Sequence, residues 1–465
     1  MKKMTAHFTR SPEGGKPARD RRPAWDERAA GGAQKAGGKG VRPGDRPRAG
    51  ALVADHQKPR EKPLALSAPR YLALCAYNIE PLVAAELRAL PEVTGVEVGS
   101  GQVSFAGPPA ALYRANLHLR CASRVLQLLG DFAYAGADEL YEAARGIAWE
   151  EFLSPEATMA VSARGLGPGI DNSMYAALRV KDAVCDRFRA RFGARPDVDV
   201  QQPMVRINVQ LYSGPTAEAR CALSLDSSDP PLHHRGYRHS GGEAPLKETL
   251  AAAILAHTGY PDIGSDPASP TAADAPGGPE MPPLVDLCCG SGTLLCEGGL
   301  RALRVAPGLS RRFGFMTWRD FDPALWQRLS DEARGQRRPV AEPFLYGADL
   351  NGRALAAAER SLEAAGLMTY GRLCCGDLRD AEPPPGGPGI VVCNPPYGER
   401  LGDEAQLVEL YRGLGDTLKR RFAGYTAYVF TANLALGRQI GLRPSARHVL
   451  YNANLEGRLL QFKLY

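Results

Sequence analysis

The sequence predicts an α/β fold in its C-terminal half, built on a doubly wound sheet with a mostly parallel centre. From residue 284 onward, short apolar segments alternate with segments of helical periodicity. The chain ends in two runs joined by a turn at 452–454, the second alternating apolar and polar residues, which predicts a closing antiparallel hairpin. Ahead of this region, residues 69–228 alternate helices with mostly antiparallel strands. They predict one or two small α+β units with ferredoxin-like features.

Each expected strand of the C-terminal half is a short run rich in aliphatic, cysteine and aromatic residues. The runs are 284–289, 343–350, 370–378, 389–394 and 425–433, followed by the hairpin at 448–465. Helical periodicity indicates helices at 293–303, 353–365 and 404–420. Gly366 supplies a stop for the second of these helices.

The preceding region is expected to start with a strand at 71–76 and a helix from about Glu80. A hairpin with a Gly-Ser-Gly turn follows at 93–107. The remaining expected helices are 108–120, 138–146 and 174–193, and the remaining strands are 124–134, 157–165, 205–214 and 218–228. A connector and an Ala-rich helix then lead to a low-complexity loop at 262–283.

Composition bounds the class of protein. The 465 residues are 44% hydrophobic and 23% charged, which suits two or three soluble domains. We expect no membrane span, since no apolar run approaches the length of one, and no secretory signal, since the basic N-terminus lacks an apolar core. The ten cysteines form no Cys-x-x-Cys pair, so we expect neither a metal site nor a disulfide framework, and a cytoplasmic location.

The positive charge is concentrated at the N-terminus. Residues 1–68 hold 16 Lys and Arg against 7 Asp and Glu, a net of +9, whereas the rest of the chain holds 41 against 44, a net of −3. This Gly-, Pro- and Arg-rich segment is expected to be a disordered tail. It is either a source of non-specific attraction to nucleic acid or a solvated leader without a binding role.

A Gly-x-Gly turn follows the first strand of the C-terminal half. Gly290 and Gly292 allow close approach of a ligand to the backbone at a helix N-terminus, although a purely structural turn has the same pattern. No Gly-Lys-Ser/Thr follows, and a third glycine of a dinucleotide fingerprint is missing. Asp286 precedes the turn, where a carboxylate suits a ligand that carries an ammonium group.

Two further acids stand at successive strand ends. Asp349 could accept both hydroxyls of a ribose, and Asp377 could accept from an adenine amine. Each alone is also a common helix N-cap. Together with Asp286 they indicate an adenosine with an amino-acid tail and no phosphate, which is S-adenosylmethionine.

The strand at 389–394 ends in Asn394, Pro395, Pro396 and Tyr397. Pro395 restricts Asn394 to extended geometry, and the turn presents an amide oxygen and a backbone carbonyl as two acceptors. Such a pair would hold a planar NH₂ group and stabilise the positive charge that develops when its nitrogen is methylated. Tyr397 would stack on the base. An inert strand-ending turn is the alternative.

The connector carries the stretch His-His-Arg-Gly-Tyr-Arg. Arg235, Tyr237 and Arg238 are candidate contacts for RNA backbone and bases, or else parts of a polar linker. The two adjacent histidines are expected to be exposed to solvent and not to bind metal.

With these motifs, "VDLCCGSGTLL", "LYGADLNGRAL" and "VVCNPPYGERLGDEAQL", the sequence resembles the THUMP-domain RNA guanine-N2 methyltransferases. It is most similar to the RlmL-type enzymes that act on 23S ribosomal RNA, over about residues 69–465. The resemblance implies a Rossmann-like class I methyltransferase domain at 229–465 after a ferredoxin-like and THUMP RNA-binding region at 69–228. It implies that Asp286, Gly290 and Gly292 line the methionine end of S-adenosylmethionine, and that Asp349 and Asp377 hold its ribose and adenine.

The same resemblance implies that the Asn394–Tyr397 turn holds the target amine. The implied partner is ribosomal RNA or a large-subunit assembly intermediate. Transfer RNA, methylation of adenine N6 or glutamine, and a non-catalytic RNA-binding or ribosome-assembly factor remain alternatives. The tail lies outside the resemblance, and from this sequence we expect no second methyltransferase module of the kind that fused members of the family carry.

Overall fold

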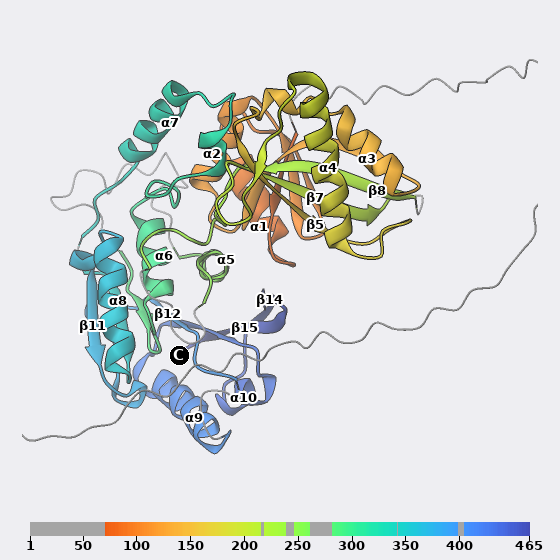
Figure 1. Ribbon diagram of the computed structural model, residues 1–465. Helices are drawn as coiled ribbons and strands as arrows, with labels where there is room; N and C mark the ends of the chain where they lie inside the picture. The colour runs from red at the N-terminus through yellow and green to blue at the C-terminus, as the bar shows by residue number, and fades with distance from the viewer. Residues whose placement is uncertain (1–69, 215–217, 239–245, 261–280, 342, 399–403) are drawn as a thin grey trace, which may run out of the picture. The chain divides into compact units, whose positions relative to one another are not determined.

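A computed structural model describes residues 70–214, 218–238, 246–260, 281–341, 343–398 and 404–465 (Figure 1). The predicted tail at 1–68 and most of the predicted loop at 262–283 lie outside the described residues. The described chain contains two large sheets, one of eight strands and one of seven. The predicted fold class is confirmed: an α+β region precedes a mostly parallel sheet that ends in an antiparallel hairpin.

The eight-stranded sheet has the order β2-β3-β1-β4-β8-β7-β5-β6. Its strands are β1 (Arg70–Leu74), β2 (Thr94–Gly99), β3 (Gln102–Ala106), β4 (Arg124–Ala133), β5 (Thr158–Arg164), β6 (Asp197–Val198), β7 (Val205–Ser213) and β8 (Ala219–Asp226). Its helices are α1 (Glu80–Arg88), α2 (Pro109–His118), α3 (Ala137–Gly146) and α4 (Ser173–Phe192), with a short 3-10 turn η1 (Trp149–Glu151). The long strand β4 pairs with β1 on one side and β8 on the other, so the region predicted as one or two small α+β units forms one sheet.

The seven-stranded sheet has the order β11-β10-β9-β12-β13-β15-β14. Its strands are β9 (Leu284–Asp286), β10 (Leu345–Asp349), β11 (Gly371–Cys375), β12 (Ile390–Cys393), β13 (Thr426–Thr431), β14 (Ala446–Asn452) and β15 (Leu455–Lys463). The five strands from β11 to β13 are parallel, and β15 and β14 complete the sheet in antiparallel fashion.

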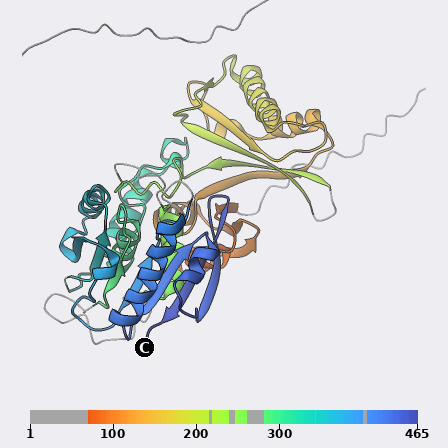
Figure 2. The same ribbon diagram turned by 90° about the horizontal axis from the view of Figure 1, so that it is seen from below.

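The helices of the second half are α5 (Glu248–Thr258), α6 (Thr293–Ala302), α7 (Pro323–Gly335), α8 (Gly352–Ala364), α9 (Glu404–Arg421) and α10 (Leu434–Gln439). Three short 3-10 turns accompany them: η2 (Gly314–Thr317), η3 (Met368–Tyr370) and η4 (Leu378–Asp380). One apolar cluster joins α9 and α10 to β12, β13 and β15. Figure 2 shows α9, in blue, lying along the blue C-terminal strands.

Two helices were not expected from the sequence. Helix α7 begins at a cap in which the Asp322 carboxylate accepts from the backbone N–H groups of Ala324 and Leu325, and Pro323 occupies its first turn. Helix α10 begins in the same way at Asn433, which accepts from two backbone N–H groups. Both caps are visible in the sequence, but neither segment was assigned an element from the sequence.

Candidate functional site

The order of the seven-stranded sheet creates a switch point between β9 and β12. The chain passes from β9 to β10 and β11 on one side, and then returns to β12 on the other side of β9. In open α/β sheets, ligands bind outside the carboxyl ends of the strands at such a point. Asp286 is the last residue of β9, and Asn394 follows β12 directly. The two sequence motifs therefore flank the same switch point.

The Gly-x-Gly turn joins β9 to α6, and its two glycines have different reasons to be there. Both have positive φ, +54° at Gly290 and +77° at Gly292. A Cβ added to Gly292 would lie 3.1 Å from the Cβ of Ala358, so this glycine permits close packing of the turn against α8. A Cβ added to Gly290 would meet nothing within 4 Å. The space over Gly290 is therefore open to a ligand.

Asp349 ends β10 and bonds to this turn. One carboxylate oxygen accepts from the backbone N–H of Gly290 at 2.8 Å, and the other accepts from the N–H of Asn351 at 2.8 Å. Each oxygen retains a second lone pair for a further donor. Asp349 thus fixes the glycine turn and can still accept from a hydroxyl.

Asp286 is 1% exposed and accepts from the backbone N–H of Cys288 at 3.1 Å. Burial, and to a lesser degree the negative charge of Asp349, raises the pKa of Asp286 to about 8, although the Cys288 N–H acts in the opposite direction. Two carboxyl groups of like sign therefore share this edge of the sheet. A cationic group beside them would offset both the burial and the repulsion.

Asp377 lies one strand further out and serves as a cap. Its carboxylate accepts from the backbone N–H of Arg379 at 2.9 Å and from the guanidinium of the same residue at 2.9 and 2.5 Å. These bonds hold the pKa of Asp377 below its usual range. The N-cap role considered from the sequence is therefore present at this position, and a role toward adenine stays a prediction.

The turn after β12 carries an acceptor without a donor. The Oδ1 atom of Asn394 is buried and has no hydrogen-bond partner among the described residues. Pro395 behind it is buried as well. Because an unsatisfied buried amide oxygen is costly, its position indicates a missing donor. Glu399 and Arg400, which follow in the same motif, lie outside the described residues.

The ring of Tyr397 is held in place by two strands. Its hydroxyl accepts from the side-chain amide of Asn452 at 3.2 Å, and its ring meets Phe430 edge-on with centroids 6.1 Å apart. Asn452 was expected only as a turn residue. No local pattern reveals its contact with Tyr397, because the two residues are 55 positions apart.

The connector residues proposed to contact RNA are buried, so that expectation is wrong for Arg235 and Tyr237. They are 3% and 4% exposed. The Arg235 guanidinium lies 3.4 Å from the Glu297 carboxylate and donates to the backbone oxygens of Leu232 and Arg120. The hydroxyl of Tyr237 donates to the same carboxylate at 3.1 Å. A cation and a phenol on the connector thus share one acid on α6.

Arg238 is also committed to internal contacts. Its guanidinium donates to the Thr293 hydroxyl at 2.5 Å and to the Leu246 carbonyl at 2.8 Å, and it lies 3.4 Å from the Glu248 carboxylate. With a side chain only 15% exposed, Arg238 is not available as an RNA contact. Thr293 is the first residue of α6, so Arg238 secures the helix that follows the glycine turn.

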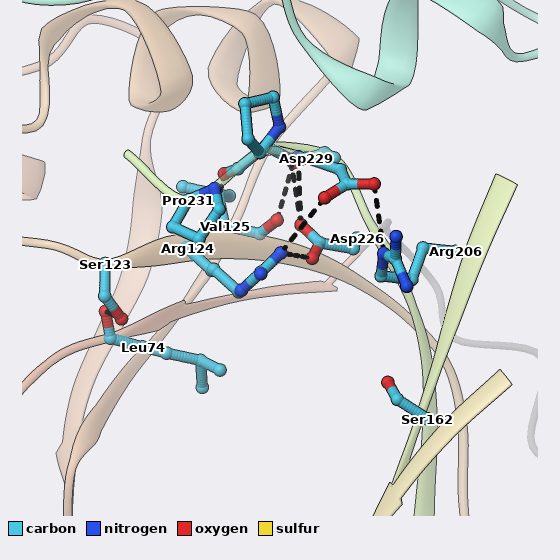
Figure 3. Close-up of polar contacts among 12 residues, drawn as sticks. Leu74, Ser123, Arg124, Val125, Ser162, Arg206, Asp226, Asp229 and Pro231 are labelled. Carbon is cyan, nitrogen blue, oxygen red and sulfur yellow. Dashed lines mark hydrogen bonds and ion pairs between the residues drawn. The ribbon is translucent and has the colours of Figure 1, made fainter. Parts of the chain in front are cut away.

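The start of the connector is fixed by a second ionic network (Figure 3). Arg124 of β4 pairs with the buried Asp226 of β8 and lies 3.7 Å from Asp229. Asp229 in turn pairs with Arg206 of β7 at 3.0 Å. Residues 226–238 are therefore a structural anchor, and of the paired histidines His234 is exposed while His233 is partly buried.

Within the described ranges, none of the helices is both long enough and apolar enough to cross a membrane. The same residues contain no group of three or more His, Cys, Asp or Glu that could hold a metal ion.

Three family models match the chain in succession. Residues 70–126 match the RlmL ferredoxin-like domain, residues 134–225 match the THUMP domain, and residues 277–461 match the RMKL-like methyltransferase domain. The first two matches cover the eight-stranded sheet, and the third covers the seven-stranded sheet.

Individual proteins with the same arrangement are known. The chain is 38% identical to the putative RNA methyltransferase slr0064 of Synechocystis, over 85% of this chain and 97% of that protein. It is 41% identical to the ribosomal RNA large subunit methyltransferase K/L of Syntrophotalea carbinolica, over 85% of this chain. The chain spans about half the length of that relative and of the other K/L relatives it matches.

The solved structures include close neighbours. The structure of SMU.472, a putative methyltransferase complexed with SAH, superposes with a TM-score of 0.72 at 28% identity, over 86% of this chain and 99% of that one. The fold, the domain matches and the relative matched along nearly its whole length agree. The chain therefore belongs to the THUMP-containing, S-adenosylmethionine-dependent RNA methyltransferases with an RlmL ferredoxin-like domain.

Proposed function

We propose that this protein transfers a methyl group from S-adenosylmethionine to the exocyclic N2 amine of a guanine in large-subunit (23S) ribosomal RNA. The relatives named ribosomal RNA large subunit methyltransferase K/L support the choice of RNA, at 38–41% identity over about 85% of this chain. We assign RNA binding to the region at 69–228 and catalysis to the region at 229–465, and we assign no role to the basic segment at 1–68. We expect the enzyme to work in the cytoplasm.

The residues around the glycine turn fit S-adenosylmethionine, which supplies a methyl group on a sulfonium. Asp286 would face the ammonium group of its methionine part, because that buried carboxyl has no cationic partner among the described residues. The open space at Gly290 would admit the ligand next to the backbone, and Asp349 would accept from the ribose hydroxyls. Asp377 would accept from the adenine amine.

The observation that carries the proposal is the buried, unpartnered Oδ1 of Asn394. A guanine N2 amine donates two hydrogens, and Asn394 with a neighbouring carbonyl of the turn would accept them. These acceptors oppose delocalisation of the nitrogen lone pair into the ring and stabilise the positive charge that grows on nitrogen. The prolines keep the acceptors in place before the substrate arrives.

Tyr397 would form the wall on which the flipped-out base stacks. Its ring is already oriented by Asn452 and Phe430, so little conformational freedom is lost when the base arrives. The rate enhancement would thus come from placement and charge stabilisation, with the proton released to solvent after transfer.

The decisive experiment identifies the methylated nucleoside. Purified protein is incubated with deuterium-labelled S-adenosylmethionine and with ribosomal or transfer RNA from a strain that lacks the gene, and the nucleosides are analysed by mass spectrometry. We expect labelled N2-methylguanosine in large-subunit RNA alone. Label in transfer RNA, or in N6-methyladenosine, would replace the proposed substrate. No label together with no calorimetric heat for the cofactor would leave a non-catalytic RNA-binding factor.

The same assay tests the amide. Asn394→Ala should lower kcat by about 100-fold or more, the size expected when one preorganised group that stabilises transition-state charge is removed. Cofactor affinity should be unchanged, because Asn394 would contact the base. Asn394→Asp keeps an acceptor oxygen and should retain more activity than the alanine variant. Equal turnover in all three proteins would remove the role assigned to Asn394.

A further inference from the structure

The end of the seven-stranded sheet formed by β14 and β15 carries a hollow lined by arginines. It has a volume of about 360 Å³ and lies between α10, the segment that follows it, β14 and β15. Leu434 and Leu460 contribute apolar surface, and four guanidinium groups surround it: Arg438, Arg443, Arg447 and Arg458. None of these residues belongs to the cofactor or target-amine site described above.

The charges in this hollow are poorly compensated by the protein itself. Arg438, Arg443 and Arg447 are exposed, and none of their guanidinium groups forms an ion pair or hydrogen bond with another described residue. Only Arg458 is paired, with Glu456 at 2.7 Å. Four cations against one anion repel one another, and this repulsion is relieved when an anion enters.

The register of the strands places the hollow beside the catalytic edge. Arg458 pairs with Thr431, the last residue of β13, and Leu460 pairs with Arg447. Paired residues share a face, and so do residues two apart on one strand, such as Arg458 and Leu460. Arg447 and Arg458 therefore line the same face of the sheet. Arg447 precedes Asn452 by five residues on β14, about 17 Å along the strand, and an odd spacing puts the two side chains on opposite faces of the sheet. Asn452 is the residue that holds Tyr397.

A short chain of contacts continues from the hollow to an aromatic pair. The Glu456 carboxylate that pairs with Arg458 also accepts from the hydroxyl of Tyr451 at 2.7 Å. The Tyr451 ring meets Tyr77 at 6.1 Å in an edge-on arrangement, and Tyr77 is 58% exposed. Arginines followed by exposed aromatic rings form the usual surface for a single nucleic-acid strand.

We propose that this arginine hollow binds backbone phosphates of the substrate RNA strand, a few nucleotides from the methylated base. Guanidinium groups match the geometry of oxyanions in a bidentate way, which favours a phosphate over a halide. The proposal rests on the proposed function in one respect, that the substrate is RNA. The proposal assigns RNA binding to residues that contact phosphates and not bases, and that are not part of the cofactor site.

The test compares two triple variants of the full chain that lose the same charge. One is Arg438→Ala/Arg443→Ala/Arg447→Ala, and the control replaces exposed arginines on α7, α8 and α9: Arg328→Ala/Arg360→Ala/Arg420→Ala. The affinity for a fluorescent large-subunit RNA fragment is measured at several salt concentrations. We expect the hollow variant to bind about tenfold more weakly at 0.1 M salt, with a salt slope smaller by about two.

The control variant should retain both affinity and slope, and both variants should bind S-adenosylmethionine as the parent does. Equal losses in the two variants would overturn the proposal in favour of general charge attraction. If inorganic phosphate stabilises the parent but not the hollow variant, and RNA affinity is the same in both, the hollow is a small-anion site and the proposal is wrong.

The outcomes separate this proposal from the proposed function. A parent that binds RNA through the hollow but methylates nothing would refute the function and keep the site. A hollow variant that binds and methylates RNA with parental constants would refute the site and keep the function.

Discussion

Two groups of charged residues, one at the sheet edge before helix α6 and one along that helix, differ in how their charges are balanced. At the sheet edge before the helix, Asp286 and Asp349 are both acidic. Along the helix, Glu297 faces the guanidinium of Arg235 at 3.4 Å and the hydroxyl of Tyr237 at 3.1 Å. The second group supplies its own opposite charge, whereas the first requires one from outside. Two acids without a cation in the described part of the chain mark a ligand site at one end of the helix. A buried acid that is paired with a cation marks a structural anchor in its middle.

The buried acceptor of Asn394 belongs with the first group. Its oxygen has no donor among the described residues, whereas Glu297 has two partners on Oε1 and only its Oε2 is buried without one. The connector motif contained more cationic and aromatic residues and was expected to contact RNA. The comparison shows that the number of charges in a motif is less informative than whether the protein satisfies them.

The largest effect that we expect concerns the paired group. Glu297→Ala removes the partner of a fully buried arginine, so it should lower the free energy of unfolding by about 3 kcal/mol or more. Urea denaturation followed by circular dichroism measures this change. Glu359→Ala, at an exposed position on α8, is the matched control and should change stability by less than about 0.5 kcal/mol.

Glu297→Gln sharpens the same point. It keeps an acceptor for Tyr237 but not the charge for Arg235, so its loss should lie between those of the other two variants. If Glu297→Ala were no more destabilising than Glu359→Ala, the connector group would not be a structural anchor, and the contrast with the sheet edge would fail.

In the second prediction, removing an acid raises the stability of the protein instead of lowering it. Burial raises the pKa of Asp286 from its ordinary value to about 8, so ionisation is less favourable in the folded than in the unfolded protein. The contribution of this group to stability is complete below pH 4 and is lost as pH rises to about 8. Asp286→Asn cannot ionise, so the ligand-free variant should have a higher Tm than the parent at pH 8.5 and nearly the same Tm at pH 4.

The same substitution should weaken S-adenosylmethionine binding by about 100-fold, because it removes a buried charge proposed to face the ammonium group. Calorimetric titration at pH 8.5 measures this loss. A variant that is both less stable and equally competent to bind would show that Asp286 is a structural residue, like Glu297.

The sequence predicted the sheet edge better than the connector for a physical reason. Strand-end acids and the Gly-x-Gly turn act within a few residues of one another, as when Asp286 accepts from Cys288. Their strands are short apolar runs whose order follows from the β/α alternation. The partner of Arg235 lies 62 residues away on a helix, and nothing in the local pattern of the connector indicates it.

The same limit applies within the candidate site. The prolines fix the turn at Asn394 locally, and the sequence therefore predicted its acceptor. The support of Tyr397 by Asn452 depends on how β14 pairs at the end of the sheet, and it became visible only in three dimensions. The position of a residue in a motif predicted whether it lies at the carboxyl edge of the sheet. Tertiary contacts decided which charged side chains already have a partner within the protein.

The smallest expected effect is a proton count, and it tests the unpaired acid directly. With a pKa of about 8, Asp286 is mostly protonated at pH 7 in the ligand-free protein. If it faces an ammonium group when the cofactor binds, its pKa must fall, and close to one proton should be released. Calorimetric titration at pH 7 in buffers of different ionisation enthalpy gives this number as a slope, and the release should fall toward zero by pH 9.

Asp377→Asn is the matched control for this measurement. The guanidinium of Arg379 holds the pKa of Asp377 below its usual range, so that carboxylate is already ionised at pH 7 and releases no proton when a ligand arrives. The variant should therefore bind with the parental proton release, even if its affinity changes. Zero release by the parent at pH 7 would mean that Asp286 stays protonated beside the ligand. In that case the edge would recognise the cofactor through hydrogen bonds alone, and the unpaired acid would no longer distinguish the ligand site from the anchor.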